Sequence, residues 1–184
     1  MIAILWVLIA VIVLVALIFI GYYNKFVILD QRIKNSLSQI DVQLKKRADL
    51  VPNLIETVKG YAKHEKGIME SVTNARKAML GAKDIVGRMK AGNVLESALG
   101  KLFAIAENYP QLKANENFLQ LQQELAAIED KIAYSRQYYN DSIMSYNNAV
   151  VTFPGKFFAD IYGKKQMEYI KIPEAQKAVP KVNF

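Results

Sequence analysis

The sequence predicts an all-α protein in which one N-terminal transmembrane helix is followed by a long antiparallel helical bundle. Three observations predict this fold class. Residues 2–20 form an uninterrupted apolar run, the apolar residues after it recur every seven positions, and the chain of 184 residues has only nine glycines and five prolines. Few turn-forming residues argue against a turn-rich all-β fold, and a seven-residue apolar repeat is typical of packed helices.

The first expected element is a membrane anchor over residues 1–24. The apolar run from Ile2 to Ile20 spans roughly 29 Å at ~1.5 Å per residue, which matches a hydrocarbon core. A cleavable signal peptide is the alternative, but no basic residue precedes the run and no small-x-small cleavage site follows it. Trp6 at one end, and Tyr22 and Tyr23 at the other, fit the interfacial positions of aromatic residues.

The charges that follow the anchor predict its orientation. The nearest basic residues on its C-terminal side are Lys25, Arg32, Lys34, Lys45, Lys46 and Arg47. By the positive-inside rule, the N-terminus lies outside and the rest of the chain lies in the cytoplasm. We therefore expect a single-pass protein of the cell (inner) membrane, with membrane lipid as one partner.

The second expected element is a helical bundle over residues 25–153, made of two arms. In the first arm the apolar residues follow two heptad rows. The rows are Phe26, Ile33, Ile40, Arg47, Leu54, Tyr61 and Ile68, and Leu37, Leu44, Val51, Val58, Glu65 and Val72. The register passes Pro52 without a phase shift, which favours a kinked but continuous helix; the alternative is a new helix near Pro52 that Asp49 caps.

The second arm is expected from Pro110 to about Phe153. Its rows are Phe118, Leu125, Ile132, Tyr139, Tyr146 and Phe153, and Leu121, Ile128, Ser135, Ser142 and Ala149. Between the arms, four glycines from Gly81 to Gly100 predict turns with weak helical pieces, followed by a short helix from about Asn93 to Asn108.

Charge and periodicity predict how the arms associate. Residues 25–77 carry a net charge of +5 and residues 111–153 a net charge of −2, so the arms should pack on each other. Sustained heptads also predict self-association into a homo-oligomer.

The third expected element is a C-terminal tail over residues 154–184, near the membrane if the second arm returns to it. The tail mixes aromatic and aliphatic residues with lysines: Phe157, Phe158, Ile161, Tyr162, Tyr169 and Ile170 among Lys156, Lys164, Lys165 and Lys171. Such a mixture suits an anionic leaflet. The alternative is that the apolar residues cap the bundle core, where such residues usually lie.

Composition excludes most catalytic chemistry. The chain has no cysteine and one histidine, His64, so it cannot form disulfides, thiolate metal sites or sites built from several imidazoles. His64 and Glu65 lack the second histidine of a zinc-protease motif, because position 68 is Ile68. Carboxylates alone, such as Glu124, Glu129 and Asp130, remain. We predict no enzymatic activity, no cofactor and no metal.

The net charge of +7 raises the question of nucleic acid. No nucleic-acid-binding motif accompanies the basic residues, and an excess of lysine beside a cytoplasmic leaflet accounts for them more simply. We therefore predict no nucleic-acid partner.

A polar group interrupts the first apolar seam. Arg47 occupies a core position and needs a partner, either Asp49 on the same helix or an acidic residue of the facing arm such as Glu129. Asn53 lies one turn from Asp49. We therefore predict an interaction or register patch made of Lys46, Arg47, Asp49 and Asn53.

Three long stretches resemble the LemA family of bacterial membrane proteins. They are NSLSQIDVQLKKRADLVPNLIETVKGY (residues 35–61), LFAIAENYPQLKANENFL (102–119) and EDKIAYSRQYYNDSIMSYNNAVVTF (129–153). The family's Arg-Arg-x-Asp-Leu-x-Pro-Asn motif stands here at residues 46–53, with Lys46 in place of its first arginine, and the terminal residues 180–184 also match.

The resemblance implies an all-α domain on one transmembrane helix, with a short extracellular N-terminus. It supplies no catalytic residues. Members are often encoded near membrane peptidases or other envelope proteins, which implies a scaffolding or accessory role. We therefore expect a membrane-anchored scaffold or interaction protein that self-associates. The alternative is an accessory regulator that recruits or modulates an envelope protein such as a membrane peptidase.

Overall fold

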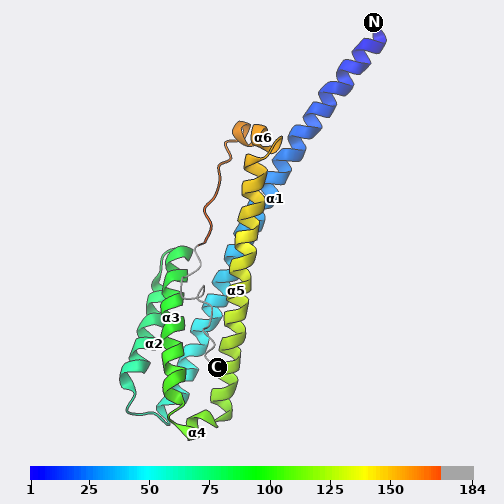
Figure 1. Ribbon diagram of the computed structural model, residues 1–184. Coiled ribbons are helices and arrows are strands. Elements are labelled where there is room, and N and C mark those ends of the chain that lie inside the picture. Colours follow the sequence, from blue (N-terminus) through cyan, green and yellow to red (C-terminus); the bar gives the residue numbers. More distant parts are fainter. Residues whose placement is uncertain (171–184) are drawn as a thin grey trace, which may run out of the picture. The chain divides into compact units, whose positions relative to one another are not determined.

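The computed structural model describes residues 1–170, and its ordered elements in that range are helices (Figure 1). They are α1 (Ile2–Lys59), α2 (Lys66–Gly81), α3 (Ile85–Ala106), α4 (Pro110–Lys113), α5 (Glu116–Val151) and α6 (Gly155–Ile161). No strand occurs among the described residues, and the all-α prediction is confirmed. The chain divides into two compact units: residues 1–36 with the chain from residue 136 onward, and residues 37–135.

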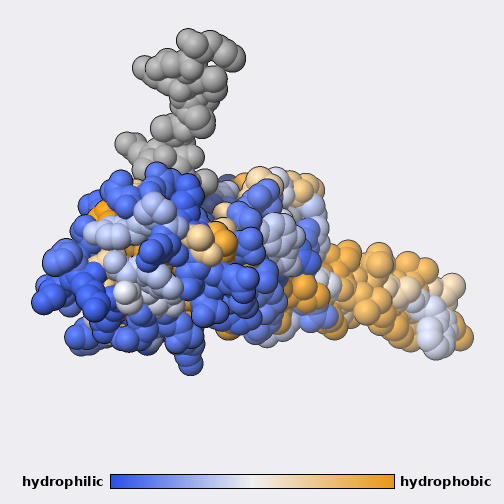
Figure 2. All heavy atoms as spheres, turned by 90° about the horizontal axis from the view of Figure 1, so that it is seen from below, coloured by the Kyte–Doolittle hydropathy of each residue, from blue (hydrophilic) through white to orange (hydrophobic). Residues whose placement is uncertain are grey.

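The N-terminal part of α1 is apolar over its whole surface. Its residues from Ile2 to Ile18 are all exposed, and Figure 2 shows them as a nearly continuous hydrophobic (orange) rod. By length and composition, α1 is the one helix among the described residues that could cross a membrane. An apolar helix surface of this size is stable only when something other than water covers it.

The first unit packs three helices around an apolar core. Its buried residues come from α1 (Phe26, Leu29, Ile33), α5 (Ile143, Tyr146, Ala149, Val150) and α6 (Phe158, Ala159). The rings of Phe26 and Tyr146 meet edge to face, with centroids 6.3 Å apart. Further toward the N-terminus of α1, Tyr22 contacts Phe158, which follows α5. The contacts therefore run in opposite directions along the two helices, so α1 and α5 are antiparallel in this unit.

The second unit contains the rest of α1 and α5 together with α2, α3 and α4. The predicted seam residues of both arms form its core. The buried apolar members are Ile40, Leu44, Val51, Leu54 and Val58 of α1 and Phe118, Leu125, Ile128 and Ile132 of α5. Asn115 at the start of α5 donates to the Tyr61 hydroxyl beyond the end of α1, while Glu129 meets Arg47 further back. The two arms are therefore antiparallel in this unit also.

Pro52 lies inside α1 without ending it, as the unbroken register predicted. A proline has no N–H, so the carbonyl four residues earlier loses its helical donor. That carbonyl belongs to Ala48, and the Arg76 side chain of α2 supplies the missing donor, with Nε 2.7 Å from the Ala48 oxygen. The helix continues because a neighbouring helix satisfies the freed carbonyl.

The first arm ends earlier than the heptad rows predicted. Helix α1 stops at Lys59, and Gly60 begins a turn that leads into α2 at Lys66. Tyr61, a predicted seam residue, is consequently exposed, whereas Val72 is buried as part of a separate helix. Glycine has the poorest helix propensity after proline, and the arm breaks there rather than at Pro52.

The glycine-rich segment is a turn only at residues 82–84. Helix α3 begins at Ile85, so the prediction of weak helical pieces up to Gly100, with a short helix starting near Asn93, is wrong. Asp84 caps α3, its carboxylate accepting from the Gly87 amide at 2.5 Å. Gly92 is buried inside α3, where a β-carbon would lie 2.8 Å from Leu44 of α1. The glycine permits the close approach of two helices, and this packing outweighs its low helix propensity.

The second arm is interrupted near its start. Helix α4 ends at Lys113, and α5 begins at Glu116 after the Asn115 side chain accepts from the Phe118 amide at 3.0 Å. At the other end α5 stops at Val151, and Phe153 is 89% exposed rather than part of the seam. The seam therefore ends where the helix ends.

Candidate functional sites: a buried arginine, a lysine-rimmed groove and an aromatic collar

The Arg47 side chain lies inside the second unit with 1% of its surface exposed. Its guanidinium pairs with the Glu129 carboxylate of α5 and donates to the Gly92 carbonyl of α3 at 3.3 Å. A second carboxylate oxygen, from Glu96 of α3, lies 4.0 Å from Nη1. Of the two partners predicted for Arg47, the facing Glu129 is the one in contact.

This cluster joins three helices. A cavity of about 250 Å³ lies beside it, lined by Arg47, Glu96, Leu99, Gly100, Phe103, Gln122, Leu125, Ala126 and Glu129. An arginine stays protonated at any accessible pH and presents donors in a fixed planar fork. Because both carboxylates approach that fork from different helices, the cluster fixes the register of α1 against α3 and α5.

The rest of the predicted patch lies on the surface. Lys46, Asp49 and Asn53 are exposed, whereas Arg47 between them is turned into the core. Asn53 lines a shallow hollow of about 320 Å³ together with residues of α5. The structure therefore does not bring the guanidinium together with the other three side chains, and the patch open to a partner is Lys46, Asp49 and Asn53.

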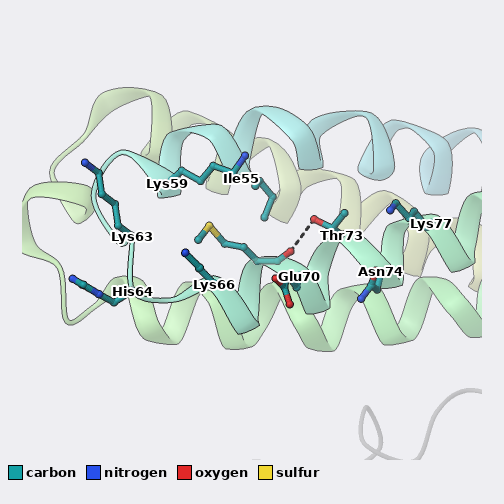
Figure 3. A pocket seen from close by; sticks show the side chains of 10 residues that line it. Ile55, Lys59, Lys63, His64, Lys66, Glu70, Thr73, Asn74 and Lys77 are labelled. Carbon is teal, nitrogen blue, oxygen red and sulfur yellow. Dashed lines mark hydrogen bonds between the residues drawn. The ribbon is translucent and has the colours of Figure 1, made fainter.

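A larger groove lies where α1 turns into α2 (Figure 3), and we call it the lysine groove. It measures about 770 Å³ and is lined by Ile55, Lys59, Lys63, His64, Lys66, Met69, Glu70, Thr73, Asn74 and Lys77. The two apolar members, Ile55 and Met69, are buried beneath the others. The lysines come from the end of α1, from the following loop and from α2, so the turn at Gly60 creates the groove.

The charge of the lysine groove is positive. Four lysines and one glutamate, Glu70, line it. Lys59 is paired with Glu56 at 2.6 Å, while Lys63, Lys66 and Lys77 have no ion pair within the described part of the chain. An apolar floor with a cationic rim suits an amphipathic segment that carries carboxylates. The basic residues of this region predicted topology, whereas the groove depends on the turn at Gly60 and has no signal in the local sequence.

Aromatic residues of α1 and of the α6 segment meet at the end of the apolar run, and we call this cluster the aromatic collar. We define it as Phe19, Tyr22, Tyr23, Phe158 and Tyr162. The Tyr22 and Phe158 rings stack at 4.3 Å, Phe19 meets Phe158 edge to face at 5.0 Å, and Tyr23 meets Tyr162 at 5.6 Å. The Tyr162 hydroxyl donates to the Phe19 carbonyl at 2.8 Å. The collar fixes α6 to the end of the apolar run.

The other predicted anchor residues are exposed. Ile2, Trp6 and Ile20 have exposed fractions of 75%, 67% and 55%. Tyr22 differs from them because Phe158 covers one of its faces. The tail aromatics were expected either at the leaflet surface or in the bundle core. Phe158 lies in the core, whereas Phe157 is 56% exposed. Lys171 and the 180–184 motif lie outside the described residues.

Two asparagines of α5 hold the chain after α6. Asn147 donates to the Met167 carbonyl at 2.9 Å and accepts from the Met167 amide at 2.8 Å. Asn140 makes the same pair of bonds with Ile170, at 3.3 and 3.0 Å. Gly163 has a φ of 62° and lets the chain reverse after α6. This clamp was not predicted, and the seven-residue spacing of the asparagines is its one signal in the sequence.

Metal-binding groups are sparse in the described range. Among residues 1–170, no group of three or more His, Cys, Asp or Glu side chains is arranged to hold a metal ion. The carboxylates noted in the sequence have other contacts: Glu129 meets Arg47, and Glu124 accepts from Gln120 at 3.0 Å.

Comparison with known proteins identifies the family. The LemA family matches residues 36–184. The magnetosome protein MamQ of Magnetospirillum gryphiswaldense is 28% identical over 173 residues, which is 80% of this chain and 64% of that protein. MamQ 2 of Paramagnetospirillum magneticum is 25% identical over 81% of this chain and 64% of its own length. Protein LemA of Metamycoplasma hominis is 26% identical over 74% of this chain and 63% of its own length. The chain thus spans less than two thirds of each of these relatives, and it belongs to the LemA family.

Proposed function

We propose that this protein is a membrane-anchored helical scaffold that recruits an acidic partner segment to the membrane surface. The observation that carries the proposal is the continuity of α1, which begins as an apolar helix and ends, without interruption, as a core helix of the second unit. One helix therefore joins the anchor to the surface that would bind the partner. The names of the relatives, MamQ and LemA, denote no enzyme.

The lysine groove supports recruitment as the mode of action. Its buried Ile55 and Met69 would receive apolar side chains, and Lys63, Lys66 and Lys77 would meet carboxylates on either side. Such a partner would be an envelope protein with an acidic amphipathic segment. A membrane peptidase with such a segment is one example, and the protein would then act as its accessory. Rim charges chiefly raise association rates and select partners, which suits a scaffold.

Self-association is the second candidate property. The heptad seams that predicted it are buried inside this chain's own units, so an oligomer would need another surface. Light scattering on the detergent-solubilised protein tests the point. A mass above that of one chain, rising with concentration, would support self-association, and a single-chain mass at all concentrations would exclude it.

The groove is tested by photo-crosslinking of the full chain in its native membrane. A photoreactive residue at Asn74, inside the groove, should yield a defined adduct with one membrane or envelope protein, and the site of attachment should be an acidic segment. The same residue at Val94, exposed on α3, should not yield this adduct.

Charge reversal provides the matched control. In the triple variant Lys63→Glu, Lys66→Glu, Lys77→Glu, the Asn74 adduct should fall by roughly tenfold, because each exposed pair contributes up to about 1 kcal/mol. The triple variant Lys90→Glu, Lys101→Glu, Lys113→Glu changes the overall charge equally, on exposed residues that do not line the groove. Equal loss in both variants, or no loss in the first, would refute the groove as the docking site.

A further inference from the structure

One face of α6 and the turn before it presents large apolar side chains to the surroundings. Phe153, Phe157 and Ile161 are 89%, 56% and 51% exposed. Phe157 and Ile161 are four residues apart on α6 and so lie on one face of it. Their neighbour Phe158 faces the other way and is buried in the core of the first unit. The exposed apolar side chains therefore do not contribute to the core of the first unit.

The place of this face along α1 identifies what covers it. Phe158 contacts Phe19 and Tyr22, and Tyr162 donates to the Phe19 carbonyl. These contacts hold α6 at the end of the Ile2–Ile20 run, as Figure 1 shows for α6 beside α1. If that run fills the hydrocarbon core, residues 19–23 lie at its boundary. The exposed face of α6 is then at the depth where aromatic residues enter a leaflet.

The charges around α6 favour an anionic leaflet. Lys156 and Lys165 are exposed, Lys164 is half-buried, and Asp160 is the acidic residue of α6. On α1, the Lys25 ammonium lies 5.7 Å from the centre of the Tyr22 ring in the collar. Lysines next to exposed aromatic residues are the pattern of segments that bind anionic headgroups while their rings enter the acyl boundary.

We propose that α6 is an interfacial foot: Phe153, Phe157 and Ile161 enter the leaflet next to the anchor, and Lys156, Lys164 and Lys165 bind anionic headgroups. The foot and the anchor are joined through the collar, so together they give the first unit two attachments to one leaflet. A single helix in a bilayer is free to tilt and rotate, whereas two attachments restrict both motions. The occupant of this surface is lipid rather than another protein.

The sequence contains no cysteine, which allows a clean test with single-cysteine variants of the full protein. An environment-sensitive NBD label is attached at Phe157→Cys or, as a matched control on the same helix, at Asp160→Cys. Both side chains are exposed, so neither substitution removes a core residue. The labelled proteins are reconstituted into vesicles of phosphatidylcholine with phosphatidylglycerol, and quenching by doxyl-labelled lipid is compared with quenching by aqueous iodide.

The label at position 157 should be quenched by the doxyl lipid and be several-fold less accessible to iodide than the label at position 160. The triple variant Lys156→Gln, Lys164→Gln, Lys165→Gln should reduce that difference, as should replacing the vesicles with pure phosphatidylcholine. Equal iodide quenching at both positions would overturn the proposal. Protection at position 157 from both quenchers would also overturn it, because a protein surface would then be the occupant.

Discussion

Arg47 of α1 and Glu129 of α5 form an ion pair inside the second unit, although the two residues do not share it equally. The arginine side chain is 2% exposed, whereas the glutamate side chain is 30% exposed. Without its partner the glutamate could still be hydrated, but the arginine could not. The pair therefore belongs to the core on the α1 side and to the surface on the α5 side, and the two residues should respond differently to substitution.

The first prediction uses this asymmetry. Glu129→Leu should lower the free energy of unfolding by about 3 kcal/mol, because it leaves a buried guanidinium without its main partner. Arg47→Met should cost only about 1 kcal/mol, since methionine fills the site and Glu129 reaches water. The double variant should be no less stable than Glu129→Leu alone. Denaturation followed by circular dichroism in detergent measures this, and equal, additive losses would contradict it.

The second prediction concerns the donor that Arg76 supplies to the Ala48 carbonyl. Arg76→Met should destabilise the protein by about 1.5 kcal/mol, because it leaves that carbonyl without a donor. In a Pro52→Ala background the helix supplies its own N–H, so the same substitution should cost less than about 0.5 kcal/mol. A double-mutant cycle isolates the difference. A coupling energy of zero would show that Arg76 does not compensate for the proline.

The third prediction concerns the clamp on the chain after α6. Asn147→Ala removes both hydrogen bonds to Met167, so hydrogen exchange at the Met167 amide should accelerate by roughly tenfold or more. Asn147→Asp keeps the acceptor for that amide and should have a smaller effect. Asn148→Ala, at the exposed neighbouring position, is the control. Unchanged exchange in Asn147→Ala would mean that the clamp does not hold the segment.

The fourth prediction compares two glycines. A β-carbon on Gly155 would lie 2.2 Å from the Ala149 carbonyl oxygen, whereas one on Gly100 would meet nothing within 4 Å. Gly155→Ala should therefore destabilise the first unit by about 2 kcal/mol or more, since backbone must move. Gly100→Ala, inside helix α3, should stabilise the second unit by about 0.5–1 kcal/mol. Thermal unfolding measures the change in stability of each variant. A change of the same sign in both variants would contradict the structure.

The fifth prediction is a pH dependence. The hydrogen bond that the Tyr109 hydroxyl donates to Glu65 at 3.0 Å, together with some burial and the charge of Glu65, raises the pKa of Tyr109 above its usual 10.0. A raised folded pKa means that the stabilisation is complete below pH 10 and is lost as the pH rises through the folded value. Burial also raises the pKa of Tyr139 and Tyr146, so titration of tyrosinate absorbance should show a late phase from which Tyr109→Phe removes one tyrosine. An unchanged late phase in that variant would reject the assignment.

Much of this architecture follows from local sequence. The apolar run and the heptad rows predicted α1, its continuity through Pro52 and most of the buried seam, because helix periodicity is a property of neighbouring residues. Arg47 was predicted to need a partner because a charge at a seam position is costly, and antiparallel arms made Glu129 a candidate. The structure confirms that pairing.

Other features depend on contacts distant in sequence and were not predictable in this way. Gly92 is tolerated in α3 because Leu44 of α1 packs against it, and no local pattern contains that contact. The lysine groove exists because the chain turns at Gly60, which brings lysines of α1 and α2 together. The local sequence contains the seven-residue spacing of the two asparagines of α5 but not their partners, which lie 20 and 30 residues further along the chain.

We propose that the chain is held in the membrane with its second unit in the cytoplasm, and the scaffold function depends on this topology. The direct measurement is labelling of a single cysteine, Gln111→Cys, with a membrane-impermeant maleimide, on protein recovered from the membrane pellet. Gln111 is exposed in the second unit, and the chain has no other cysteine. We predict no labelling in intact spheroplasts and full labelling after permeabilisation. Equal labelling in both states would place the second unit outside the cell and contradict the account.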